Sequence, residues 1–430
     1  MSTPTKRIAF HTLGCKLNFS ETATISRDFT RHGFEQVDYR DQADVYVLNT
    51  CSVTENADKE ARKLIRQAKR RNPNSSVAVI GCYAQLNPNE IANIDGVDLI
   101  LGAEEKFNLI KYLDQIEFND SATIIQSNID YVHKFKPSYS SGERTRAFLK
   151  VQDGCDYTCS FCTIPLARGK SRSDTIEKTI EMAKQVAATK TKEIVLTGVN
   201  IGDFGKGTDE TFFDLIQQLN DLKGIDRIRL SSIEPNLLTD DIIEFCAGSK
   251  KFMHHFHIPL QSGSNKILST MRRRYKSELY KNRVEKIKQM IPDACIGVDV
   301  IVGFPGETND DFLETYNFLN ELDIAYLHVF TYSERLNTDA MKIRKSVPKE
   351  IRVQRSKMLH ILSDKKQRYF NDQFIDTTRL VLFEKRKNGE LYGYTDNYIQ
   401  VRINGGIKLI NSILPVKLLS NHGNMVDGNI

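Results

Sequence analysis

The chain has 430 residues, which corresponds to about three domains at ~150 residues per domain. Apolar residues make up 40% and charged residues 27%, so the composition is that of a globular protein and argues against collagen, coiled coil or extensive disorder. The 60 basic and 55 acidic residues leave a net charge of +5, an excess too small to indicate nucleic-acid binding by itself. No apolar run approaches the roughly 18 residues of a membrane-spanning helix, and the start lacks the apolar segment of a secretory signal. We therefore expect a cytoplasmic protein whose eight cysteines are metal ligands or catalytic groups rather than disulfides.

Residues 6–115 alternate between predicted strands and helices. Helical patterns near 20–31 and 55–71 lie between short apolar runs, rich in Val and Ile, that predict strands at Lys6–Phe10, Asp44–Asn49 and Ser76–Ile80. This alternation indicates a Rossmann-like parallel sheet with right-handed crossovers. The segment 116–140 is rich in Asn, Ser and Asp and predicts a linker.

Residues 145–330 repeat a strand-plus-helix unit of about 30 residues, the size of one βαβ element. The predicted strands are 147–151, 193–197, 227–231, 255–260, 296–302 and 325–330. The predicted helices lie near 174–188, 211–222, 239–247, 277–290 and 309–321. Six units fall short of the eight that close a full barrel. We therefore predict an α/β fold with a central partial (β/α)6 barrel, and an ordinary doubly wound sheet is the alternative.

The last part of the chain changes character. Residues 350–370 have the spacing of an amphipathic helix, with Ile351, Met358 and Leu362 on one side. Short β-rich segments punctuated by glycine follow at Leu380–Glu384, Tyr398–Ile403 and Ile407–Ile410. This pattern predicts a small C-terminal antiparallel β-barrel or sheet.

Three cysteines form a Cys-x3-Cys-x2-Cys motif directly after the first strand of the central region: Cys155, Cys159 and Cys162. A structural zinc site takes four closed ligands, usually from two knuckles, and this motif has no fourth Cys or His near it in sequence. A cubane iron–sulfur cluster normally takes four thiolates, so three thiolates leave one iron able to coordinate another group. The motif therefore favours a [4Fe-4S] cluster with one open iron over a zinc site with a distant fourth ligand.

Three further cysteines each follow a predicted strand of the N-terminal region: Cys15, Cys51 and Cys82. The carboxyl ends of parallel strands meet at one edge of a sheet, where ligands bind. The three thiols therefore either converge on one point or are unrelated, half-buried residues, as free cysteines commonly are. Cys246 and Cys295 are most simply explained as core residues.

Four strand ends of the central region carry polar residues or glycine: Thr197–Asn200, Ser231–Pro235, His257–Ser264 and Val302–Thr308. Barrels of this type build their active sites at the carboxyl ends of their strands, and glycine lets a ligand approach the backbone closely. A nucleoside that carries a charged amino-acid tail would need such a mixture of groups, and the three-cysteine loop in register with these segments strengthens the case for an active site here. His254, His255 and His257 are explained by the alternation of a strand, so we assign them no ligand role.

Basic residues cluster locally despite the small net charge. One cluster lies on the predicted helix near 55–71, a second is Arg272–Arg274, and a third is Lys342–Lys345. Such runs usually mark a solvated face. The C-terminal β region combines cations with Tyr392, Tyr394 and Tyr398, as small barrels that hold single-stranded RNA do.

The chain resembles the radical S-adenosylmethionine methylthiotransferases over roughly residues 6–420. The segments that carry this resemblance are TLGCKLNFSET, LNTCSVTENADKEARK, VIGCYAQ, KVQDGCDYTCSFCTIPLARGKSRS, the four strand-end motifs and MRRRY. The resemblance implies three domains. These are an N-terminal methylthiotransferase domain at 4–116, a radical S-adenosylmethionine core at 141–372 and a TRAM-like RNA-binding barrel at 374–430.

The resemblance also implies two [4Fe-4S] clusters. Cys155, Cys159 and Cys162 would hold the catalytic radical cluster, and Cys15, Cys51 and Cys82 would hold an auxiliary cluster. Phe161 would pack beside the adenine of S-adenosylmethionine, and the other residues implied to bind this cofactor are Thr197, Gly198, Asn200, Ser232, Glu234, Gln261, Val302 and Gly303. We expect RNA to be bound by Arg272, Arg273, Arg274, Lys385, Arg386 and Tyr394.

The reaction implied is addition of a methylthio group to C2 of the adenine at tRNA position 37. That carbon bears an unactivated C–H bond, so the cofactors supply the difficult chemistry. The GCKLN context of Cys15 resembles the branch that acts on N6-threonylcarbamoyladenosine. The alternatives are the branches that act on N6-isopentenyladenosine or on a ribosomal-protein aspartate, and a non-catalytic, metal-stabilised RNA-binding protein. The implied partners are the tRNA anticodon loop and a reductant such as flavodoxin or a ferredoxin-like protein.

Overall fold

The computed structural model describes residues 5–51, 55–114, 121–140 and 145–430. Residues 52–54 of the motif LNTCSVTENADKEARK therefore lie outside the described part. The chain forms two compact units. The first contains Met1–Ser140, Phe148–Tyr157 and Thr163–Ser173, and the second contains Ser141–Ala147, Thr158–Cys162 and Asp174–Ile430.

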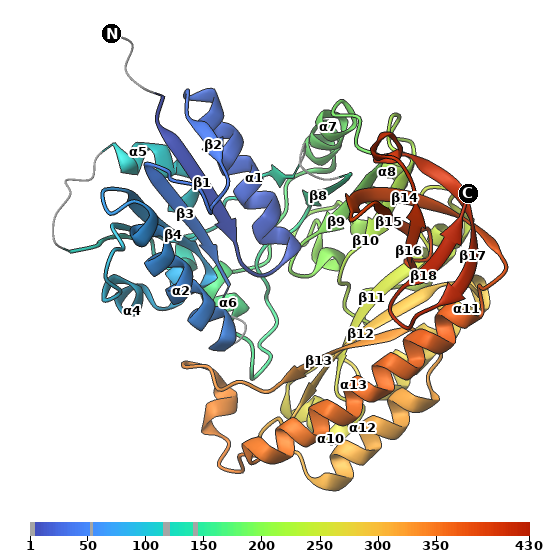
Figure 1. Ribbon diagram of the computed structural model, residues 1–430. Coiled ribbons are helices and arrows are strands. Elements are labelled where there is room, and N and C mark those ends of the chain that lie inside the picture. Colours follow the sequence, from blue (N-terminus) through green and yellow to red (C-terminus); the bar gives the residue numbers. More distant parts are fainter. Residues whose placement is uncertain (1–4, 52–54, 115–120, 141–144) are drawn as a thin grey trace. The chain divides into compact units, whose positions relative to one another are not determined.

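The first unit is built on a parallel sheet with the strand order β2-β1-β3-β4-β5-β6, which confirms the predicted Rossmann-like architecture (Figure 1). Its strands are β1 Arg7–Thr12, β2 Glu35–Val37, β3 Val45–Thr50, β4 Ser76–Gly81, β5 Leu99–Leu101 and β6 Thr123–Ile125. Strand β6 lies in the segment predicted as a linker. It pairs with β5, because its Thr and Ile side chains suit an edge strand of the sheet. A further short strand, β7 (Ser138–Tyr139), pairs antiparallel with β8.

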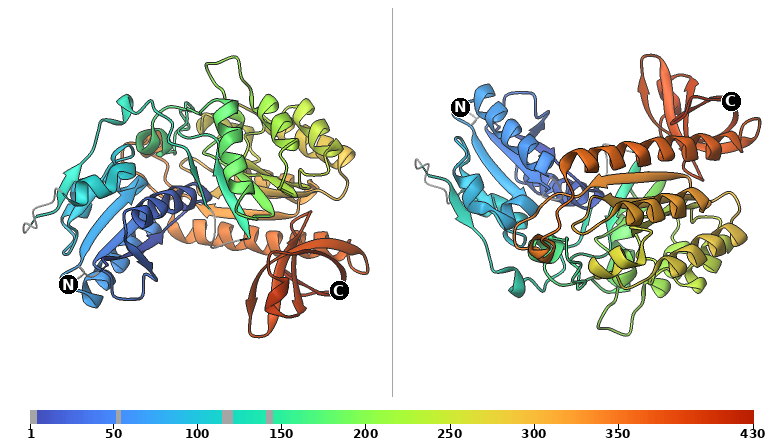
Figure 2. Two further views of the ribbon diagram at one scale, coloured as in Figure 1. Left: turned by 90° about the horizontal axis from the view of Figure 1, so that it is seen from above. Right: turned by 90° about the horizontal axis from the view of Figure 1, so that it is seen from below.

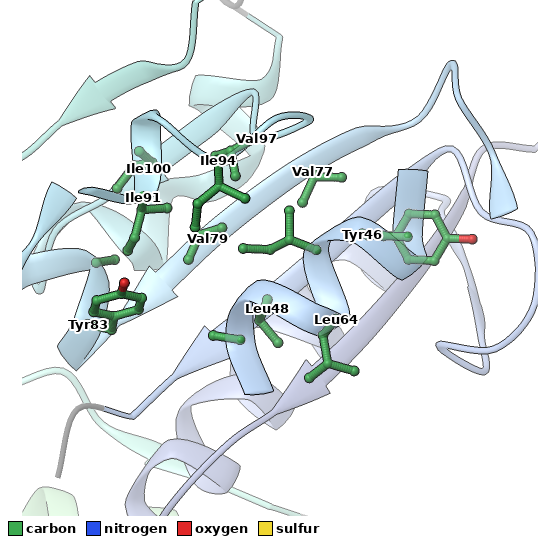
Figure 3. Packing of buried hydrophobic residues seen from close by; sticks show 14 of the residues in the cluster. Tyr46, Leu48, Leu64, Val77, Val79, Tyr83, Ile91, Ile94, Val97 and Ile100 are labelled. Carbon is green, nitrogen blue, oxygen red and sulfur yellow. The ribbon is translucent and has the colours of Figure 1, made fainter. Parts of the chain in front are cut away.

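Helices cover both faces of this sheet. They are α1 Lys16–Arg31, α2 Glu55–Arg71, α3 Cys82–Leu86, α4 Pro88–Ala92 and α5 Leu109–Leu113, and α6 Ile164–Arg168 also belongs to the unit. Strands β3 and β4 are buried along their whole length, as expected for central strands of a parallel sheet. Figure 3 shows one of the two cores, in which Tyr46, Leu48, Val77 and Val79 of these strands pack against Leu64 of α2.

The second unit begins with the six strands predicted for the central region. They are β8 Arg146–Lys150, β9 Glu193–Thr197, β10 Arg227–Leu230, β11 His255–Gln261, β12 Cys295–Val302 and β13 Tyr326–Thr331, and only the first two residues of β8 belong to this unit. From β9 to β13 every neighbouring pair is parallel, which agrees with the predicted partial barrel. The intervening helices are α7 Ile176–Ala187, α8 Phe212–Asn220, α9 Asp240–Gly248, α10 Asn265–Thr270, α11 Ser277–Met290 and α12 Asn309–Glu321.

Helix α13 (Lys349–Asp372) packs against β13 and leads into a closed barrel with the order β14-β15-β16-β18-β17 (Figure 2). The barrel strands are β14 Thr378–Lys387, β15 Glu390–Thr395, β16 Gln400–Asn404, β17 Ile413–Asn421 and β18 Val426–Asn429. The predicted strand Ile407–Ile410 is wrong, because Ile407–Leu409 is a 3-10 turn that reverses the chain after Gly405 and Gly406. Within the described residues, no helix is long and apolar enough to cross a membrane.

The C-terminal barrel is joined to the starts of β9 and β10 by buried charged groups. Arg227 donates hydrogen bonds from its guanidinium to the carbonyl oxygens of Leu380 (2.7 Å) and Tyr394 (3.2 Å). Arg229 donates to the carbonyl oxygen of Asp396 (3.2 Å) and forms an ion pair with Glu193 (2.9 Å). The barrel is therefore fixed at the amino ends of these strands, away from the polar segments that follow their carboxyl ends.

Candidate functional site

Three thiols lie at the same edge of the first unit's sheet. Cys15 directly precedes α1, Cys51 directly follows β3, and Cys82 begins α3 directly after β4. Strands β1, β3 and β4 are neighbours, with Thr12 opposite Asn49 and Thr50 opposite Gly81. The register therefore places Cys51 and Cys82 side by side, and the structure brings the three predicted cysteines to one edge.

Two glycines allow the close approach of these loops. Gly14 has φ +94°, and a Cβ atom at this position would lie 2.6 Å from Cβ and 2.9 Å from Sγ of Cys51. Gly81 has φ +98°, and its Cβ would lie 2.4 Å from the carbonyl oxygen of Thr50. Both positions combine a left-handed backbone with no room for a side chain, so both require glycine. Cys51 thus lies directly against the loop that carries Cys15.

Cys155 belongs to the first unit and is held by the backbone. Its N–H donates to the carbonyl oxygen of Gly169 (3.0 Å), and its Sγ accepts from the N–H of Tyr157 (3.4 Å). Gly154 has φ +70°, and a Cβ there would lie 2.0 Å from the carbonyl oxygen of Lys170. The PLARGK part of the motif, through Gly169 and Lys170, therefore packs directly against the backbone of Gly154 and Cys155.

Cys159 and Cys162 belong to the second unit. The N–H of Cys162 donates to the carbonyl oxygen of Cys159 (3.1 Å), which closes a tight turn. The backbone of Ser160, between them, donates to Met271 (3.1 Å) and accepts from Ala340 (2.7 Å). This part of the loop is therefore anchored to the segment after α10 and to the segment after β13.

Arg273 is the charged side chain that faces this turn. Its guanidinium donates to Sγ of Cys159 (3.1 Å) and pairs with Glu234, and its side chain is only 4% exposed. Burial raises the pKa of the Cys159 thiol, and the charge of Arg273 opposes this shift. Burial also raises the pKa of Glu234, again opposed by Arg273. The position of Arg273 favours a role at the cysteine turn over the predicted binding of RNA.

The predicted cofactor residues lie at the carboxyl ends of β9 to β12, where several of them are in contact. Asn200 accepts from the backbone N–H of Glu234 through its amide oxygen (3.4 Å) and donates to Asp203 (3.1 Å). Ser232 Oγ is 2.6 Å from Nδ1 of His257. Thr197 is the last residue of β9 and Gly198 follows it, and Gln261 ends β11 with the uncommon φ of +68°. Asn200, Ser232 and Glu234 thus form a polar edge, and Arg273 pairs with Glu234.

The other two predicted cofactor residues, Val302 and Gly303, lie at the carboxyl end of β12. Val302 is the last residue of β12, and Gly303 follows it with φ +75°. The N–H of Gly303 donates to Glu307 (2.7 Å), and a Cβ at this position would lie 2.3 Å from Cγ of Arg352. Phe161 packs edge-on against Phe304, with ring centroids 6.4 Å apart. The turn after β12 therefore supports the aromatic residue of the cysteine turn.

A group of histidines and a carboxylate lies on the neighbouring strands β11, β12 and β13. Asp299 accepts from His257 Nε2 (2.8 Å) and His328 Nδ1 (3.1 Å) through the same oxygen. Burial would raise the pKa of Asp299, but these two hydrogen bonds outweigh it and hold the pKa well below its usual range. The ligand atoms of these three residues lie within 4.8 Å of one another, a spacing that could also hold a metal ion. The alternation of the sequence indicated a strand here, but not this pairing.

The remaining residues predicted to bind RNA have different environments. Arg272 is exposed and paired with Asp339 (2.6 Å), and Arg274 is exposed. Lys385 and Arg386 are exposed on β14, with the Lys385 ammonium 5.8 Å from the Tyr392 ring. Tyr394, in contrast, stacks on Tyr398 with centroids 4.8 Å apart and lies under the guanidinium of Arg146. Lys385 and Arg386 are therefore exposed to solvent, with the Arg386 Nε donating to the carbonyl oxygen of Gly405 (3.1 Å), whereas Tyr394 packs within the second unit.

Comparison with known proteins identifies the family. Residues 7–102 match the family described as "Uncharacterized protein family UPF0004", and residues 149–319 match the Radical SAM superfamily. The chain is 41% identical over 424 residues to the Bacillus subtilis (strain 168) protein named threonylcarbamoyladenosine tRNA methylthiotransferase MtaB, covering 96% of this chain and 93% of that protein. The chain belongs to the radical S-adenosylmethionine methylthiotransferase family. It is thus an enzyme of the methylthiotransferase type.

Two further comparisons concern a relative that is named for a different nucleoside and a solved structure with the same fold. A Clostridium botulinum (strain Loch Maree / Type A3) protein named tRNA-2-methylthio-N(6)-dimethylallyladenosine synthase is 32% identical, covering 95% of this chain and 93% of that protein. The solved structure of the radical S-adenosylmethionine methyltransferase TsrM from Kitasatospora setae shares the fold, with a TM-score of 0.56, 13% identity, and coverage of 76% of this chain and 75% of that one. Membership of this family implies S-adenosylmethionine and a [4Fe-4S] cluster.

The donors on the described chain fit such groups. A radical cluster needs three thiolates and an open iron; the Cys-x3-Cys-x2-Cys motif carries three cysteines in sequence, and within the second unit Arg273 faces the turn of Cys159 and Cys162. A second cluster needs another three thiolates, and Cys15, Cys51 and Cys82 lie at one sheet edge.

The sequence reasoning did not single out Glu21 and Arg168, two charged residues that are buried in the first unit. The sequence held one sign that Glu21 is buried. It lies three residues after Asn18, so both side chains are on the same, buried face of α1.

Proposed function

We propose that the protein adds a methylthio group to C2 of N6-threonylcarbamoyladenosine at position 37 of tRNA. The observation that carries this proposal is the 41% identity, over 96% of the chain, to a protein named for that nucleoside. The relative named for dimethylallyladenosine is 32% identical over a similar span. The threonylcarbamoyl branch is therefore favoured over the isopentenyl branch.

The proposal assigns the radical cluster to Cys155, Cys159 and Cys162 and the auxiliary cluster to Cys15, Cys51 and Cys82. Bound there, S-adenosylmethionine and the clusters would supply the radical and sulfur-transfer chemistry that an unactivated C–H bond calls for. The chain's own residues bind and orient these groups. Arg273 places a positive charge beside Cys159, and the polar edge formed by Asn200, Ser232 and Glu234 offers donors and acceptors to a ribose and an amino-acid tail.

The C-terminal barrel is the proposed RNA-binding module, with Lys385 and Arg386 on its exposed surface. The proposed partners are tRNA and an electron donor such as flavodoxin or a ferredoxin-like protein. A tRNA substrate and such a donor both fit the expectation of a cytoplasmic location.

The experiment measures nucleosides and iron on the same material. Loss of the methylthio form of threonylcarbamoyladenosine from tRNA of a strain lacking the protein supports the assigned substrate. Loss of a methylthio isopentenyl form instead supports the other tRNA branch. A colourless purified protein that holds zinc and little iron would overturn the enzymatic proposal.

Cysteine variants separate the two clusters. Cys159→Ala is expected to abolish 5′-deoxyadenosine formation. Cys51→Ala is expected to retain that cleavage but to attach no sulfur to the RNA. The matched control is Cys246→Ala, because Cys246 is buried on α9 and lies in neither set. Methylthiolated product from the Cys51→Ala protein would remove the auxiliary cluster from the mechanism.

A further inference from the structure

A buried ionic network lies next to the auxiliary cysteine edge, entirely within the first unit. Its centre is Glu21 on α1, whose side chain is fully buried. Glu21 accepts from Lys106 (2.6 Å), Lys150 (2.9 Å) and Arg168 (3.1 Å). Burial alone would raise the pKa of Glu21, but the surrounding cations outweigh it and hold the pKa well below its usual range. Glu21 is therefore ionised at every physiological pH.

Arg168 links this network to the loops that carry Cys15 and Cys51. Its guanidinium donates to the amide oxygen of Asn18 over 2.6 Å. The amide nitrogen of Asn18 donates to the carbonyl oxygens of Leu13 (2.9 Å) and Thr50 (3.1 Å). Leu13 and Thr50 lie just before Gly14-Cys15 and Cys51, so one arginine orients the amide that holds both loops.

Arg168 also reaches the segment before Cys155. The guanidinium donates to Asp153 over 2.9 Å, and Lys150 and Arg172 pair with the same carboxylate at 2.7 Å and 3.2 Å. Asp153 stands two residues before Cys155, which also belongs to the first unit. Arg168 is thus a direct structural connection between the auxiliary cysteine loops and the start of the three-cysteine motif.

The network holds more positive than negative charge. Four cations, namely Lys106, Lys150, Arg168 and Arg172, face two carboxylates, namely Glu21 and Asp153, so two positive charges are unbalanced when all six groups are ionised. A buried charge without a counterion is costly. Arg168 interacts electrostatically with Cys82 and Cys15, so the charge of this network acts on the auxiliary cysteine edge. A cubane cluster held by three thiolates is an anion and gains one more negative charge on reduction.

We propose that Arg168 is a positioning residue for the auxiliary cluster, and that its buried charge stabilises the reduced state of that cluster. The inference rests on the proposed function, because it requires a cluster at Cys15, Cys51 and Cys82. Two effects follow. The link through Asn18 sets how well the three thiols bind a cluster, and the charge of Arg168 sets how readily the bound cluster accepts an electron.

The test isolates the auxiliary cluster in the full-length protein, in a background where Cys155, Cys159 and Cys162 are all replaced by Ala. Iron content and the midpoint potential, followed by electron paramagnetic resonance, are measured after anaerobic reconstitution. Arg168→Met is expected to bind less iron, and the cluster that does form is expected to have a more negative midpoint potential. Arg168→Lys keeps the positive charge, so its midpoint potential is expected to stay near that of the parent. It loses the planar guanidinium that binds Asn18, so it is still expected to bind less iron.

Asn18→Ala separates position from charge. This variant keeps every charge of the network and loses the bonds to Leu13 and Thr50, so we expect lower iron content with an unchanged potential. The matched control is Lys170→Met, which removes an exposed positive charge from the same loop and should change neither value. Circular dichroism identifies any variant that does not fold, and the lysine and asparagine variants then decide the question.

The outcomes distinguish this inference from the proposed function. Parent-like iron content and potential in both Arg168 variants would overturn the role of Arg168 and leave the auxiliary cluster intact. Absence of iron from the background protein itself would instead overturn the auxiliary cluster, and with it the proposed function.

Discussion

The guanidinium of Arg273 donates a hydrogen bond to Sγ of Cys159 over 3.1 Å. The same side chain pairs with Glu234, at the carboxyl end of β10. A cysteine of the turn is thereby connected to the polar edge formed by the strand ends of the second unit. Hydrogen bonds to cluster sulfurs are among the features that set cluster stability and potential.

The first prediction concerns Arg273. Arg273→Met removes a charge-assisted hydrogen bond, which contributes about 1.5–3 kcal/mol, so formation of 5′-deoxyadenosine should fall by roughly 10-fold or more. Arg272→Met is the matched control, since Arg272 is exposed and pairs with Asp339. Normal 5′-deoxyadenosine formation by the Arg273 variant would contradict its placement beside the radical cluster.

The second prediction concerns Gly14. A methyl group at this position would collide with Cβ and Sγ of Cys51 and would require a backbone conformation that alanine rarely adopts. Gly14→Ala should therefore displace the loop and leave about half of the iron, that of the radical cluster, in the protein. Gly33→Ala is the control, because it has a similar φ of +84° but open space around it. Full iron content in the Gly14 variant would show that the loop does not need this close approach.

The third prediction concerns the surface of the C-terminal barrel. Replacing Lys385 and Arg386 by Ala should weaken tRNA binding and reduce the slope of log affinity against log salt by about one for each phosphate that is no longer neutralised. Tyr394→Phe should leave binding unchanged, because the Tyr394 ring packs on Tyr398 within the second unit. Filter binding or fluorescence anisotropy over a salt series measures both. An unchanged salt dependence in the double variant would place the RNA elsewhere.

The fourth prediction concerns the start of α12. Asp311 caps this helix together with Thr308 and pairs with Lys266 at 2.7 Å. Burial would raise its pKa, but the hydrogen bonds from Lys266 and Thr308 prevail and lower the pKa of Asp311 to about 2. Because the folded-state pKa of about 2 lies below the ordinary pKa of 3.8, this stabilisation is present above about pH 4 and is lost as the pH falls towards 2.

Asp311→Asn should therefore cost about 1–2 kcal/mol of unfolding free energy at neutral pH and much less near the acid end of that range. Asp310→Asn provides the comparison, since Asp310 is an exposed neighbour in the same helical turn. Urea denaturation at several pH values measures the difference. If the loss of unfolding free energy does not change with pH, it results from the altered side-chain shape rather than from the lost charge.

The fifth prediction concerns Asp299. Its two hydrogen bonds to histidines account for the geometry without an ion, so Asp299→Asn should destabilise the protein by about 2 kcal/mol and leave its metal content unchanged. Elemental analysis of the parent and variant proteins decides the matter. A metal ion that disappears together with the carboxylate would identify Asp299, His257 and His328 as its ligands.

Most strands of the two units could be predicted from the sequence, because the features that identify a strand lie within the strand itself. Buried parallel strands such as β3, β4 and β12 are short, largely apolar runs rich in Val, so their composition and length predict them. The topological rule about where parallel strands end allowed Cys15, Cys51 and Cys82 to converge without requiring it, and the family resemblance favoured convergence. Strands of two or three residues, such as β6 and β7, are too short to have a periodicity and were missed.

The roles of charged residues were less predictable. MRRRY shows three arginines in a row, and nothing in that string indicates that the middle one is buried against Glu234 while its neighbours are exposed. The same holds for Glu21 and Arg168, whose partners are up to 150 residues away in sequence. Burial of a charge depends on which distant groups surround it, and a single sequence does not contain that information.

The hydrogen bonds from Arg227 and Arg229 to the C-terminal barrel affect how this chain can be shortened. Both guanidiniums are buried, and both give hydrogen bonds to main-chain carbonyls that only the barrel supplies. A protein cut before Thr378 would keep both arginines but lose these carbonyl acceptors, and of the two only Arg229 would retain its ion pair with Glu193. The barrel thus behaves as part of the folding unit, and a shorter relative that lacked it would need different residues at positions 227 and 229.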